Sequence, residues 1–233
     1  MIRAVAVVIP VHDEEELLGE CLASVAVASE HLRATHPDIT CRVWAVLDAC
    51  RDASEAVAEA AGVRIVRVEV RNVGAARAAG LDAARARFAH VPPHELWTAH
   101  TDADSAVPAH WLSHQVTLAE DGADVVVGTV RPDFRDLDAQ RTAAWWARYS
   151  PGVANGHVHG ANLGIRAALL DEVGGFDHVP EHEDVRLVDA ARAAGAAIVA
   201  TDGAWVRTSA RQHGRTPGGY ARYLREDLIA GAG

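Results

Sequence analysis

The sequence predicts an α/β fold, with a mixed, mostly parallel β-sheet and helices on both of its faces. Runs of β-branched residues alternate with segments whose apolar residues recur at helical spacing. This alternation is typical of parallel strands joined by helical crossovers. The 233 residues, 49% of them hydrophobic, suffice for one medium-sized domain with a substantial core.

The first half of the chain alternates regularly between strands and helices. The β-branched run "AVAVVIP" predicts a strand that stops at Pro10, and "SEAVAEAAG" predicts a helix that Gly62 closes. By the same criteria we expect strands at 4–10, 42–49, 63–70 and 95–100, and helices at 17–32, 54–62 and 73–90.

The second half changes character but contains no clear domain boundary. No internal repeat or low-complexity linker interrupts it, so we expect the whole chain to form a single domain. The expected elements are a strand at 122–130, an amphipathic helix at 135–150, a glycine-punctuated strand and helix at 156–177, a helix at 181–195 and a pair of strands at 196–210.

Composition and charge exclude some partners and some mechanisms. The formal net charge is −10, and all 22 basic residues other than histidine are arginines. A chain with this balance offers no basic face to a phosphate backbone, so we expect no nucleic-acid partner. The absence of lysine also excludes every mechanism that requires a lysine side chain.

The cysteines and the N-terminal segment bear on location. Cys21, Cys41 and Cys50 are odd in number and lack C-x-x-C spacing, which favours buried small hydrophobic residues over disulfides or a zinc site. The apolar run in "MIRAVAVVIPVHDEEE" is too short to span a membrane and lacks a cleavage site, so we interpret it as a strand. These features predict a cytoplasmic protein without a transmembrane segment.

A short acidic motif, Asp102 and Asp104 around one alanine, follows the fourth predicted strand. In parallel sheets, ligands bind beyond the carboxyl ends of the strands, where "PVHDEE", "LDACRDAS" and "RNVGAARAAG" also lie. Magnesium or manganese commonly takes one or two carboxylates plus the phosphates of a substrate. A surface turn and a metal site are both compatible with D-x-D alone. The presence of three other polar loops at the same edge of the sheet favours the metal site.

Several motifs, in their order along the chain, resemble family 2 glycosyltransferases of the GT-A fold. The resembling segments are "VIPVHDEEELLGECLASV", "VLDACRDAS", "RNVGAARAAGLDAA", "TDADSAVPAHWL", "GANLGIRAALLDEVGGFD" and "HEDVRL". Together they cover most of residues 5 to 190. The resemblance implies one Rossmann-like GT-A domain over 1–233, with a nucleotide-binding half at 1–105 and an acceptor-binding half at 106–233 that ends in a lid.

The implied activity is transfer of a sugar from a nucleoside-diphosphate donor to an acceptor hydroxyl with inversion of configuration. UDP is favoured over GDP on family grounds, and Mn²⁺ or Mg²⁺ is the implied cofactor. A retaining GT-A transferase and a non-catalytic nucleotide-sugar-binding protein of the same fold are the alternatives. A phosphatase of the haloacid dehalogenase type is disfavoured, because it places D-x-D after the first strand and uses a lysine. No motif identifies the sugar, the acceptor or the oligomeric state.

The resemblance assigns the donor side to the loops after the first four strands. Glu14 would accept hydrogen bonds from ribose hydroxyls, Asp48 would contact the base edge, and Arg77 would offer a planar donor fork to phosphate. Where the family commonly has glycine and serine after this aspartate, the chain has Ala49 and Cys50, which leaves the identity of the base open. The implied nucleotide-sugar-binding residues are Pro10, Val11, His12, Glu14, Asp48, Asn72, Gly74, Arg77, Asp102 and Ala103.

The metal ligands and the catalytic base are implied by two acidic pairs. Asp104 matches the direct metal ligand, and Asp102 would contact the metal or the ribose. A bound metal neutralises the charge that builds on the diphosphate as its bond to the sugar breaks. Asp184 matches the base that takes a proton from the acceptor hydroxyl, and Glu183 would orient the acceptor or the helix. Acids in a first helical turn are also favoured by the helix macrodipole whatever the function.

The acceptor side matches the G-x-N element of the family at Gly160, Ala161 and Asn162. Trp145 and Trp146 offer a stacking platform for a sugar, with packing inside a helix as the alternative. His157 and His159 alternate along an extended run, but a zinc site is disfavoured because no cysteine lies at ligand spacing.

A glycine-rich segment near the C-terminus, "RTSARQHGRTPGGYARYL", carries Arg211, His213 and Arg215. By resemblance, a histidine or arginine of such a loop completes the metal site or binds the diphosphate. His213 is therefore a candidate third metal ligand, and the segment is a candidate lid over the donor.

Overall fold

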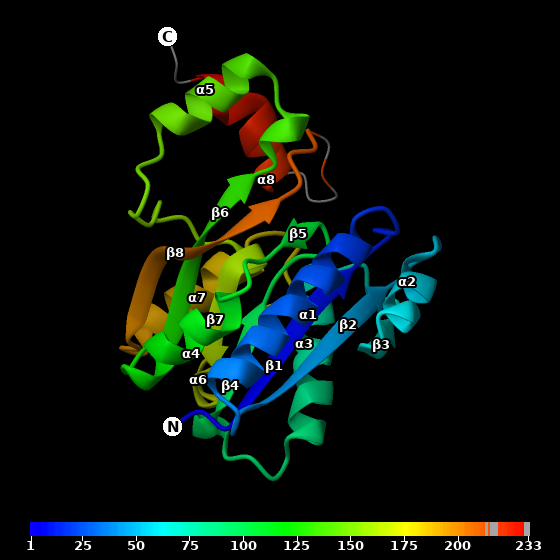
Figure 1. The fold of residues 1–233 in the computed structure, drawn as a ribbon, viewed down its shortest axis with the longest axis vertical. Coiled ribbons are helices and arrows are strands. Elements are labelled where there is room, and N and C mark those ends of the chain that lie inside the picture. The colour runs from blue at the N-terminus through cyan, green and yellow to red at the C-terminus, as the bar shows by residue number, and fades with distance from the viewer. Residues whose placement is uncertain (213, 215–218, 231–233) are drawn as a thin grey trace.

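The computed structural model describes residues 1–212, 214 and 219–230, and in this part of the chain the strands form one eight-stranded sheet (Figure 1). The strand order is β3-β2-β1-β4-β7-β6-β8-β5. The strands are β1 Ala4–Val11, β2 Thr40–Asp48, β3 Arg64–Val68, β4 Leu96–His100, β5 Ser105–Ala106, β6 Val125–Pro132, β7 Leu163–Arg166 and β8 Ile198–Thr208.

Helices connect these strands and also form the C-terminal end of the described chain. The α-helices are α1 Leu18–Thr35, α2 Ser54–Ala60, α3 Val73–Arg87, α4 Trp111–Glu120, α5 Ala139–Ala147, α6 Ala167–Val173, α7 Glu183–Ala193, α8 Tyr220–Arg222 and α9 Leu228–Ala230. The shorter helical turns are η1 Pro93–Glu95, η2 Phe134–Asp136, η3 Gly160–Asn162 and the π-helical η4 Tyr223–Asp227.

The sheet is mixed, as the sequence predicts. In the described residues, β1 pairs in parallel with β2 and β4, β2 with β3, and β6 with β8. The antiparallel pairs are β4 with β7, β6 with β7, and β5 with β8. The regular first half of the chain therefore forms the parallel part of the sheet, whereas the less regular second half supplies the antiparallel strands.

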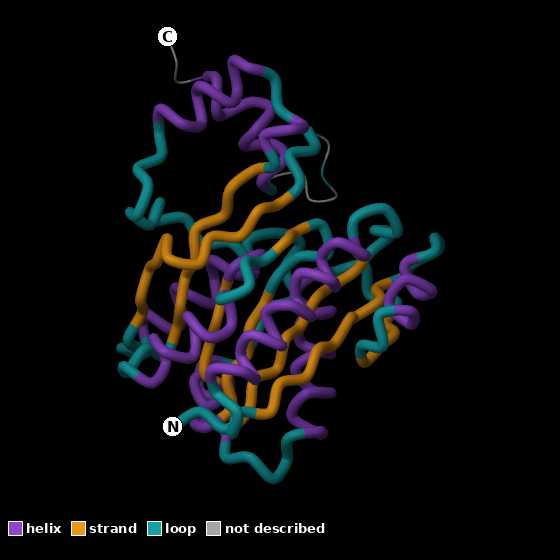
Figure 2. Tube along the Cα trace, in the orientation of Figure 1, coloured by secondary structure: helices purple, strands orange, loops and turns teal. Residues whose placement is uncertain are grey.

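Helices cover both faces of the sheet, which confirms the predicted layers (Figures 1 and 2). The buried strand β1 explains why both faces are covered, because its successive side chains enter different cores. Val7 and Ile9 pack with residues of α1 and α4, whereas Val8 packs on the other face with residues of α3, α6 and α7. A strand that is apolar at every position requires a layer of helices on each side.

A smaller helical layer lies beyond the ends of β6 and β8, where α5 and the C-terminal helices gather in Figure 1. It has its own apolar cluster, separate from the cores that cover the sheet. The buried members of this cluster are Trp145, Tyr149, Ala210, Leu224 and Leu228. This helical layer therefore borders the space beyond the carboxyl ends of β6 and β8.

The predicted pair of strands at 196–210 is wrong, because this segment forms the single strand β8 with an irregularity in its middle. Pairing with β6 runs to Thr201 opposite Gly128 and resumes at Val206 opposite Val130. Asp202, within the irregular stretch, accepts hydrogen bonds from Gly152 N at 2.9 Å and from the hydroxyl of Tyr149. The bulged backbone thus brings a buried carboxylate to the segment that follows α5.

Two further expectations concern the whole chain. Among the described residues, none of the helices combines the length and the apolar composition needed to cross a lipid bilayer. The three cysteines are free thiols, with Cys21 buried and Cys41 and Cys50 half-buried, so the predicted absence of disulfides is confirmed. Burial raises the pKa of the Cys21 thiol, which keeps it protonated and unreactive.

A fully buried histidine on β4, His100, predicts a pH dependence of stability. Burial lowers the pKa of His100 well below its usual value of 6.5, and the charge of Arg77 adds to this shift. Below about pH 6.5 the unfolded chain therefore binds one more proton at this position than the folded protein does, and stability falls as the pH decreases. We expect His100→Leu to reduce the slope of unfolding free energy against pH by about 1.4 kcal/mol per pH unit.

Urea unfolding between about pH 5 and 8 measures this slope. His94→Leu is the matched control, because it makes the same chemical change at a side chain that is 69% exposed. Equal slopes for the wild type and His100→Leu would show that His100 does not cause the pH dependence of stability.

Candidate active site

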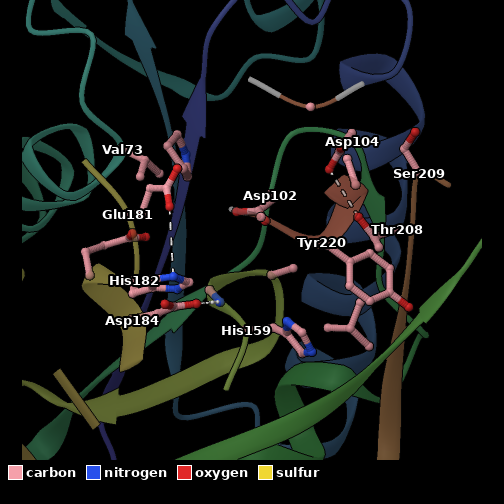
Figure 3. Close-up of a pocket in the computed structure, with 18 of the residues that line it drawn as sticks. Val73, Asp102, Asp104, His159, Glu181, His182, Asp184, Thr208, Ser209 and Tyr220 are labelled. Carbon is pink, nitrogen blue, oxygen red and sulfur yellow. Dashed lines mark hydrogen bonds and ion pairs between the residues drawn. The ribbon is translucent and has the colours of Figure 1, made fainter. Parts of the chain in front are cut away.

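A cavity of about 1070 Å³ opens at the carboxyl ends of β1, β2 and β4. Pro10 and His12 line it at the end of β1, Asp48 at the end of β2, and Asp102 after β4. On the other side it is lined by residues of α7, α8 and η4, including Tyr220 (Figure 3). The polar loops that the sequence places on one edge of the sheet therefore meet in one cavity, and C-terminal helices complete it.

The D-x-D motif lies in the tight loop between β4 and β5, with both carboxylates on the cavity and Ala103 buried between them. Asp102 Oδ1 accepts from Arg77 Nη2 at 2.6 Å. Asp104 Oδ1 accepts from Thr208 Oγ1 at 3.2 Å, and its Oδ2 lies 3.0 Å from Arg211 Nη2. Each aspartate thus has its own arginine partner.

The surroundings of the two aspartates make their negative charges unfavourable. The Asp102 side chain keeps 39% of its surface exposed on the cavity, yet it lies deep enough for burial to raise its pKa. Burial likewise raises the pKa of Asp104, and the negative charge of Asp102 adds to this shift while Arg211 opposes it. Arg77 opposes the shift in the pKa of Asp102. A cation placed between these carboxylates would relieve this cost.

The Arg77 guanidinium is 2% exposed and joins two acidic side chains across the floor of the cavity. It donates to Glu183 through Nη1 and to Asp102 through Nη2. Its carbon lies 5.6 Å from the ring centroid of Phe176. The sequence predicts that Arg77 binds donor phosphate, whereas the structure shows its fork occupied by carboxylates within the protein.

The other residues of the N-x-G-x-x-R element also make contacts within the protein. Asn72 caps α3 by accepting from Ala75 N at 2.8 Å, and its Nδ2 donates to Val179 O at 2.9 Å. A Cβ atom at Gly74 would lie 2.2 Å from Asp177 O. The close approach that this glycine permits is therefore to the backbone of the neighbouring segment, and Gly74 does not line the cavity.

The acidic pair at the start of α7 borders the cavity, but its two carboxylates have different partners. Glu183 is 5% exposed and bound to Arg77. Asp184 lines the cavity, where its Oδ2 accepts from Gly160 N at 2.7 Å and its Oδ1 from Val185 N at 2.8 Å. The two acids that are adjacent in sequence therefore have different environments: the Glu183 carboxylate pairs with a buried guanidinium, whereas the Asp184 carboxylate accepts from backbone N–H groups.

Asp48 holds the loop that precedes α3. Its carboxylate accepts from the backbone N–H groups of Val70 at 2.8 Å, Arg71 at 2.7 Å and Asn72 at 2.8 Å. His12 Nδ1 lies 2.5 Å from Asp48 O, a contact in which the imidazole N–H is the donor. The Asp48 carboxylate thus accepts three hydrogen bonds within the protein. A donor group on a nucleotide base would bind to its remaining lone pairs.

Strained backbone gathers around the same cavity. In the described chain, the non-glycine residues with positive φ are Asp13 at 49°, Ala49 at 53°, Arg71 at 47° and His182 at 63°. Arg71 and His182 line the cavity, and the other two flank lining residues. Ala49 occupies one of the positions where the family commonly has glycine, and its φ explains that preference. Such strain costs roughly 1–3 kcal/mol per residue and concentrates at functional sites.

Glu14 and Arg211 form a bidentate ion pair across the cavity. Arg211 Nη1 donates to Glu14 Oε2 at 3.0 Å, and Nη2 donates to Glu14 Oε1 at 2.8 Å. Since the same Nη2 lies 3.0 Å from Asp104 Oδ2, one guanidinium joins the predicted ribose-binding and metal-binding residues. Arg211 belongs to the C-terminal segment in which the sequence predicts such a residue; His213 and Arg215 lie outside the described residues.

The donor set around D-x-D fits a hard divalent cation, because both side chains present carboxylate oxygens on the cavity. These aspartates do not belong to any cluster of three ligand groups in the described residues, so they would supply one or two protein ligands. That number suits Mg²⁺ or Mn²⁺ with the phosphates of a substrate. The described chain has such a three-ligand cluster elsewhere, at Asp13, Cys50 and Asp52, where it is half-buried.

The predicted acceptor residues separate into those on the cavity and those below it. Gly160 and Ala161 line the cavity. Asn162 does not: its Nδ2 donates to Thr129 O and Ala204 O, both at 3.0 Å, and its Oδ1 accepts from Trp111 Nε1. Asn162 is therefore a structural residue that joins η3 to the sheet.

Of the two tryptophans of the predicted platform, Trp145 lines the cavity with little exposed surface and Trp146 does not line it. Trp145 is 5% exposed and packs in the helical cluster, and Trp146 is stacked on Phe134 and does not line the cavity. The exposed aromatic surface of the cavity comes instead from Tyr220 and Tyr223 of the C-terminal helices. Neither tyrosine stands out in the sequence, because only the packing of these helices beyond β8 brings them to the site.

Comparison with known proteins agrees with the fold. The family model for glycosyl transferase family 2 matches residues 6–170. The solved structure of TarS from S. aureus is similar with a TM-score of 0.65 at 15% identity, over 88% of this chain and 36% of that chain. In a shorter TarS structure the covered share of that chain is 64%. This chain thus spans about a third to two thirds of the TarS chains it matches, and no curated protein matches it.

Two further solved structures were determined with ligands. A mannosyltransferase from Pyrobaculum calidifontis in complex with GDP-Man and Mn²⁺ has a TM-score of 0.63 at 20% identity, covering 97% of this chain and 69% of that chain. Glucosyl-3-phosphoglycerate synthase from Mycobacterium tuberculosis, in complex with Mn²⁺, UDP and phosphoglyceric acid, has a TM-score of 0.54 at 19% identity, covering 98% and 78%. Because the family model covers most of the sheet and the cavity loops, the chain belongs to glycosyl transferase family 2 and has its GT-A fold.

Proposed function

We propose that the protein is a metal-dependent glycosyltransferase that moves a sugar from a nucleoside diphosphate to an acceptor hydroxyl with inversion. One observation supports this most strongly: D-x-D and Asp184 present carboxylates to the same cavity from separate elements, with Asp104 beside Thr208 and Asp184 on the far side of Asp102 (Figure 3). Metal binding and proton removal are then performed by different carboxylates. Family membership and the similar structures with nucleotides and Mn²⁺ support the same conclusion.

Asp104, with Asp102, would hold Mn²⁺ or Mg²⁺ at the donor. When bound, the cation supplies charge neutralisation for the leaving diphosphate. The buried Arg77 holds Asp102 in place through its 2.6 Å contact, so the motif is oriented before any ligand binds. Glu14 and the free acceptor positions of Asp48 face the ribose and base of the nucleotide. UDP is the first nucleotide to test and GDP the second, since the similar structures contain either one.

Asp184 is the proposed general base. Its carboxylate is fixed by Gly160 N–H at 2.7 Å and Val185 N–H at 2.8 Å, and it lines the cavity on which an acceptor would lie. The acceptor oxygen attacks the anomeric carbon as its proton passes to Asp184, and the bond from that carbon to the diphosphate oxygen breaks. Glu183 acts through Arg77 as a positioning residue and does not touch the acceptor.

Calorimetric titration with UDP, GDP and their sugars, with Mn²⁺ and with EDTA, tests the donor site in the wild type and in Asp104→Ala. We expect metal-dependent binding that Asp104→Ala weakens by more than tenfold, since it removes a direct ligand. Binding without any turnover in an acceptor screen would favour the non-catalytic alternative. Proton NMR of the product's anomeric centre would show inversion, and a retained configuration would contradict Asp184 as a simple base.

The Arg211 contact yields a prediction about the metal alone. Its guanidinium lies 3.0 Å from Asp104 Oδ2, where it competes with a cation for the same oxygen. We expect Arg211→Met to strengthen binding of Mn²⁺ without nucleotide by about tenfold, because the variant removes a neighbouring positive charge. Electron paramagnetic resonance of free Mn²⁺ measures this affinity.

Arg207→Met is the matched control for Arg211→Met. Arg207 also lies near the end of β8, but its partners are Asp133 at 2.8 Å and Glu20. It should leave Mn²⁺ affinity unchanged. Unchanged or weaker Mn²⁺ binding in Arg211→Met would show that the guanidinium does not compete with the cation.

A further inference from the structure

The cavity next to Asp184 has a continuous aromatic wall, formed by His157, His159, Tyr220 and Tyr223. The Tyr220 and Tyr223 rings are stacked, with centroids 5.7 Å apart and planes inclined by 22°. The His159 ring meets Tyr220 edge-on at 5.4 Å, and the His157 ring lies 6.5 Å from that of Tyr223. All four residues line the cavity.

The wall lies beside the proposed base. His159 immediately precedes Gly160, whose N–H donates to Asp184 Oδ2 at 2.7 Å. In Figure 3, His159 lies between Tyr220 and Asp184, and Tyr220 lies below Thr208 and Asp104. A sugar ring on this wall, at its His159 end, would therefore present a hydroxyl toward Asp184.

The wall is held in place by contacts within the protein. Trp145 Nε1 donates to the Tyr220 hydroxyl at 3.1 Å, which fixes the edge of that ring. Tyr223 follows Tyr220 by one helical turn, so the two rings share a face of the helix. Preorganised aromatic rings bind a flat apolar surface at little entropic cost.

The wall carries little charge. Among its neighbours in the described lining, at 145–159 and 219–223, Arg148 is the one arginine, and its Nη1 donates to Asp227 O at 3.2 Å. Burial lowers the pKa of His159 to about 4, so its ring is neutral at pH 7. The carboxylates of Asp184 and Glu181 lie on the adjacent lining. A phosphate or carboxylate on the acceptor would meet like charges there, which is unfavourable.

We propose that the acceptor is an uncharged sugar, whose pyranose ring packs against the aromatic wall while one of its hydroxyls meets Asp184. The apolar C–H face of a pyranose matches an aromatic ring, and its hydroxyls match the polar edges of histidine and tyrosine. The cavity of about 1070 Å³ has room for a nucleotide sugar and a second ring. This inference rests on the proposed function and adds to it the chemical class of the acceptor.

Saturation-transfer NMR on the protein with Mn²⁺ and bound UDP or GDP tests this inference. The probes are uncharged methyl glycosides and disaccharides, compared with sugar phosphates and phosphoglycerate. We expect at least one uncharged glycoside to bind and the phosphorylated compounds to bind more weakly. Tyr223→Ser should weaken the binding of that glycoside by about 2- to 10-fold, the range expected for loss of one stacking contact. Tyr223→Phe should bind the glycoside as the wild type does.

The outcomes separate this inference from the function on which it rests. If neither nucleotide binds, the proposed function is wrong and the acceptor inference is lost with it. If a nucleotide binds but no uncharged glycoside does, or the phosphorylated compounds bind more tightly, the acceptor inference alone is wrong. Equal glycoside affinity in Tyr223→Ser and the wild type, with unchanged nucleotide affinity as evidence of folding, would also overturn it.

Discussion

Asp184→Asn is expected to lower kcat by a factor of about 10² to 10⁴ while leaving the affinity for the donor nucleotide unchanged. The carboxylate oxygens are held by Gly160 N–H and Val185 N–H, and an asparagine of the same shape keeps an acceptor oxygen for one of them. The variant thus removes the proton acceptor without removing a contact to the metal or to Arg77. The rate is measured as nucleotide release with the acceptor that the wild type uses fastest, and donor affinity by calorimetry.

Asp189→Asn provides the matched control for this experiment. Asp189 lies on the same helix, α7, but its side chain is 61% exposed and pairs with Arg192 on the surface. The same chemical change there should leave kcat unaltered. A loss of less than about tenfold in Asp184→Asn would assign the base to another group, since general bases contribute more than that.

Arg77→Met is expected to lower the free energy of unfolding by about 3–5 kcal/mol. The guanidinium is 2% exposed and neutralises Glu183 and Asp102, so its removal leaves the buried Glu183 carboxylate without its partner. Removing one partner of a buried ion pair costs more free energy than an exposed ion pair contributes, because the charge that remains stays desolvated. Urea unfolding of the wild type and of Arg77→Met measures this change in the free energy of unfolding.

Two further variants show whether the unpaired charge is the cause. In Arg85→Met, on the same helix, the lost partner is the half-exposed Asp171, and we expect a loss below about 1 kcal/mol. Adding Glu183→Leu to Arg77→Met should restore part of the stability, because it removes the carboxylate left without a partner. If Arg77→Met lowers the free energy of unfolding no more than Arg85→Met does, the pairing of Glu183 and Asp102 with Arg77 does not stabilise the fold.

The elements that were predictable from sequence are those with strong periodicity and clear stop signals. The segment 4–11 is apolar at nearly every position, which predicts a strand covered on both faces, and β1 lies between β2 and β4. The segment 196–210 was misinterpreted because Asp202 and Gly203 interrupt its apolar pattern. A local interruption is compatible with either a turn or a bulge, and only pairing with β6 on both sides of it distinguishes the two.

The candidate site shows the same division between local and long-range information. Motif order was sufficient to place Asp48, Asp102 and Asp104 on one cavity, because the carboxyl ends of neighbouring parallel strands share an edge. Asp184, in the first turn of α7, was assigned to the site by the family resemblance. The roles of Arg77, Gly74 and Asn162 were not predictable. Their partners Glu183, Asp177 and Thr129 are distant in sequence, and whether a polar side chain faces a ligand or the protein depends on such partners.

The amino-acid sequence thus specifies the α/β class, the order of the loops and the carboxylates available for a metal and a base, since these follow from local periodicity and residue type. Folding in three dimensions assigns each carboxylate its neighbour: Arg77 between Asp102 and Glu183, and Arg211 between Glu14 and Asp104. It also brings Tyr220 against His159 and Tyr223 against His157 to form the aromatic wall. The physical reason is that burial and pairing, which set the charge and exposure of a side chain, arise from contacts between segments that the local sequence does not encode.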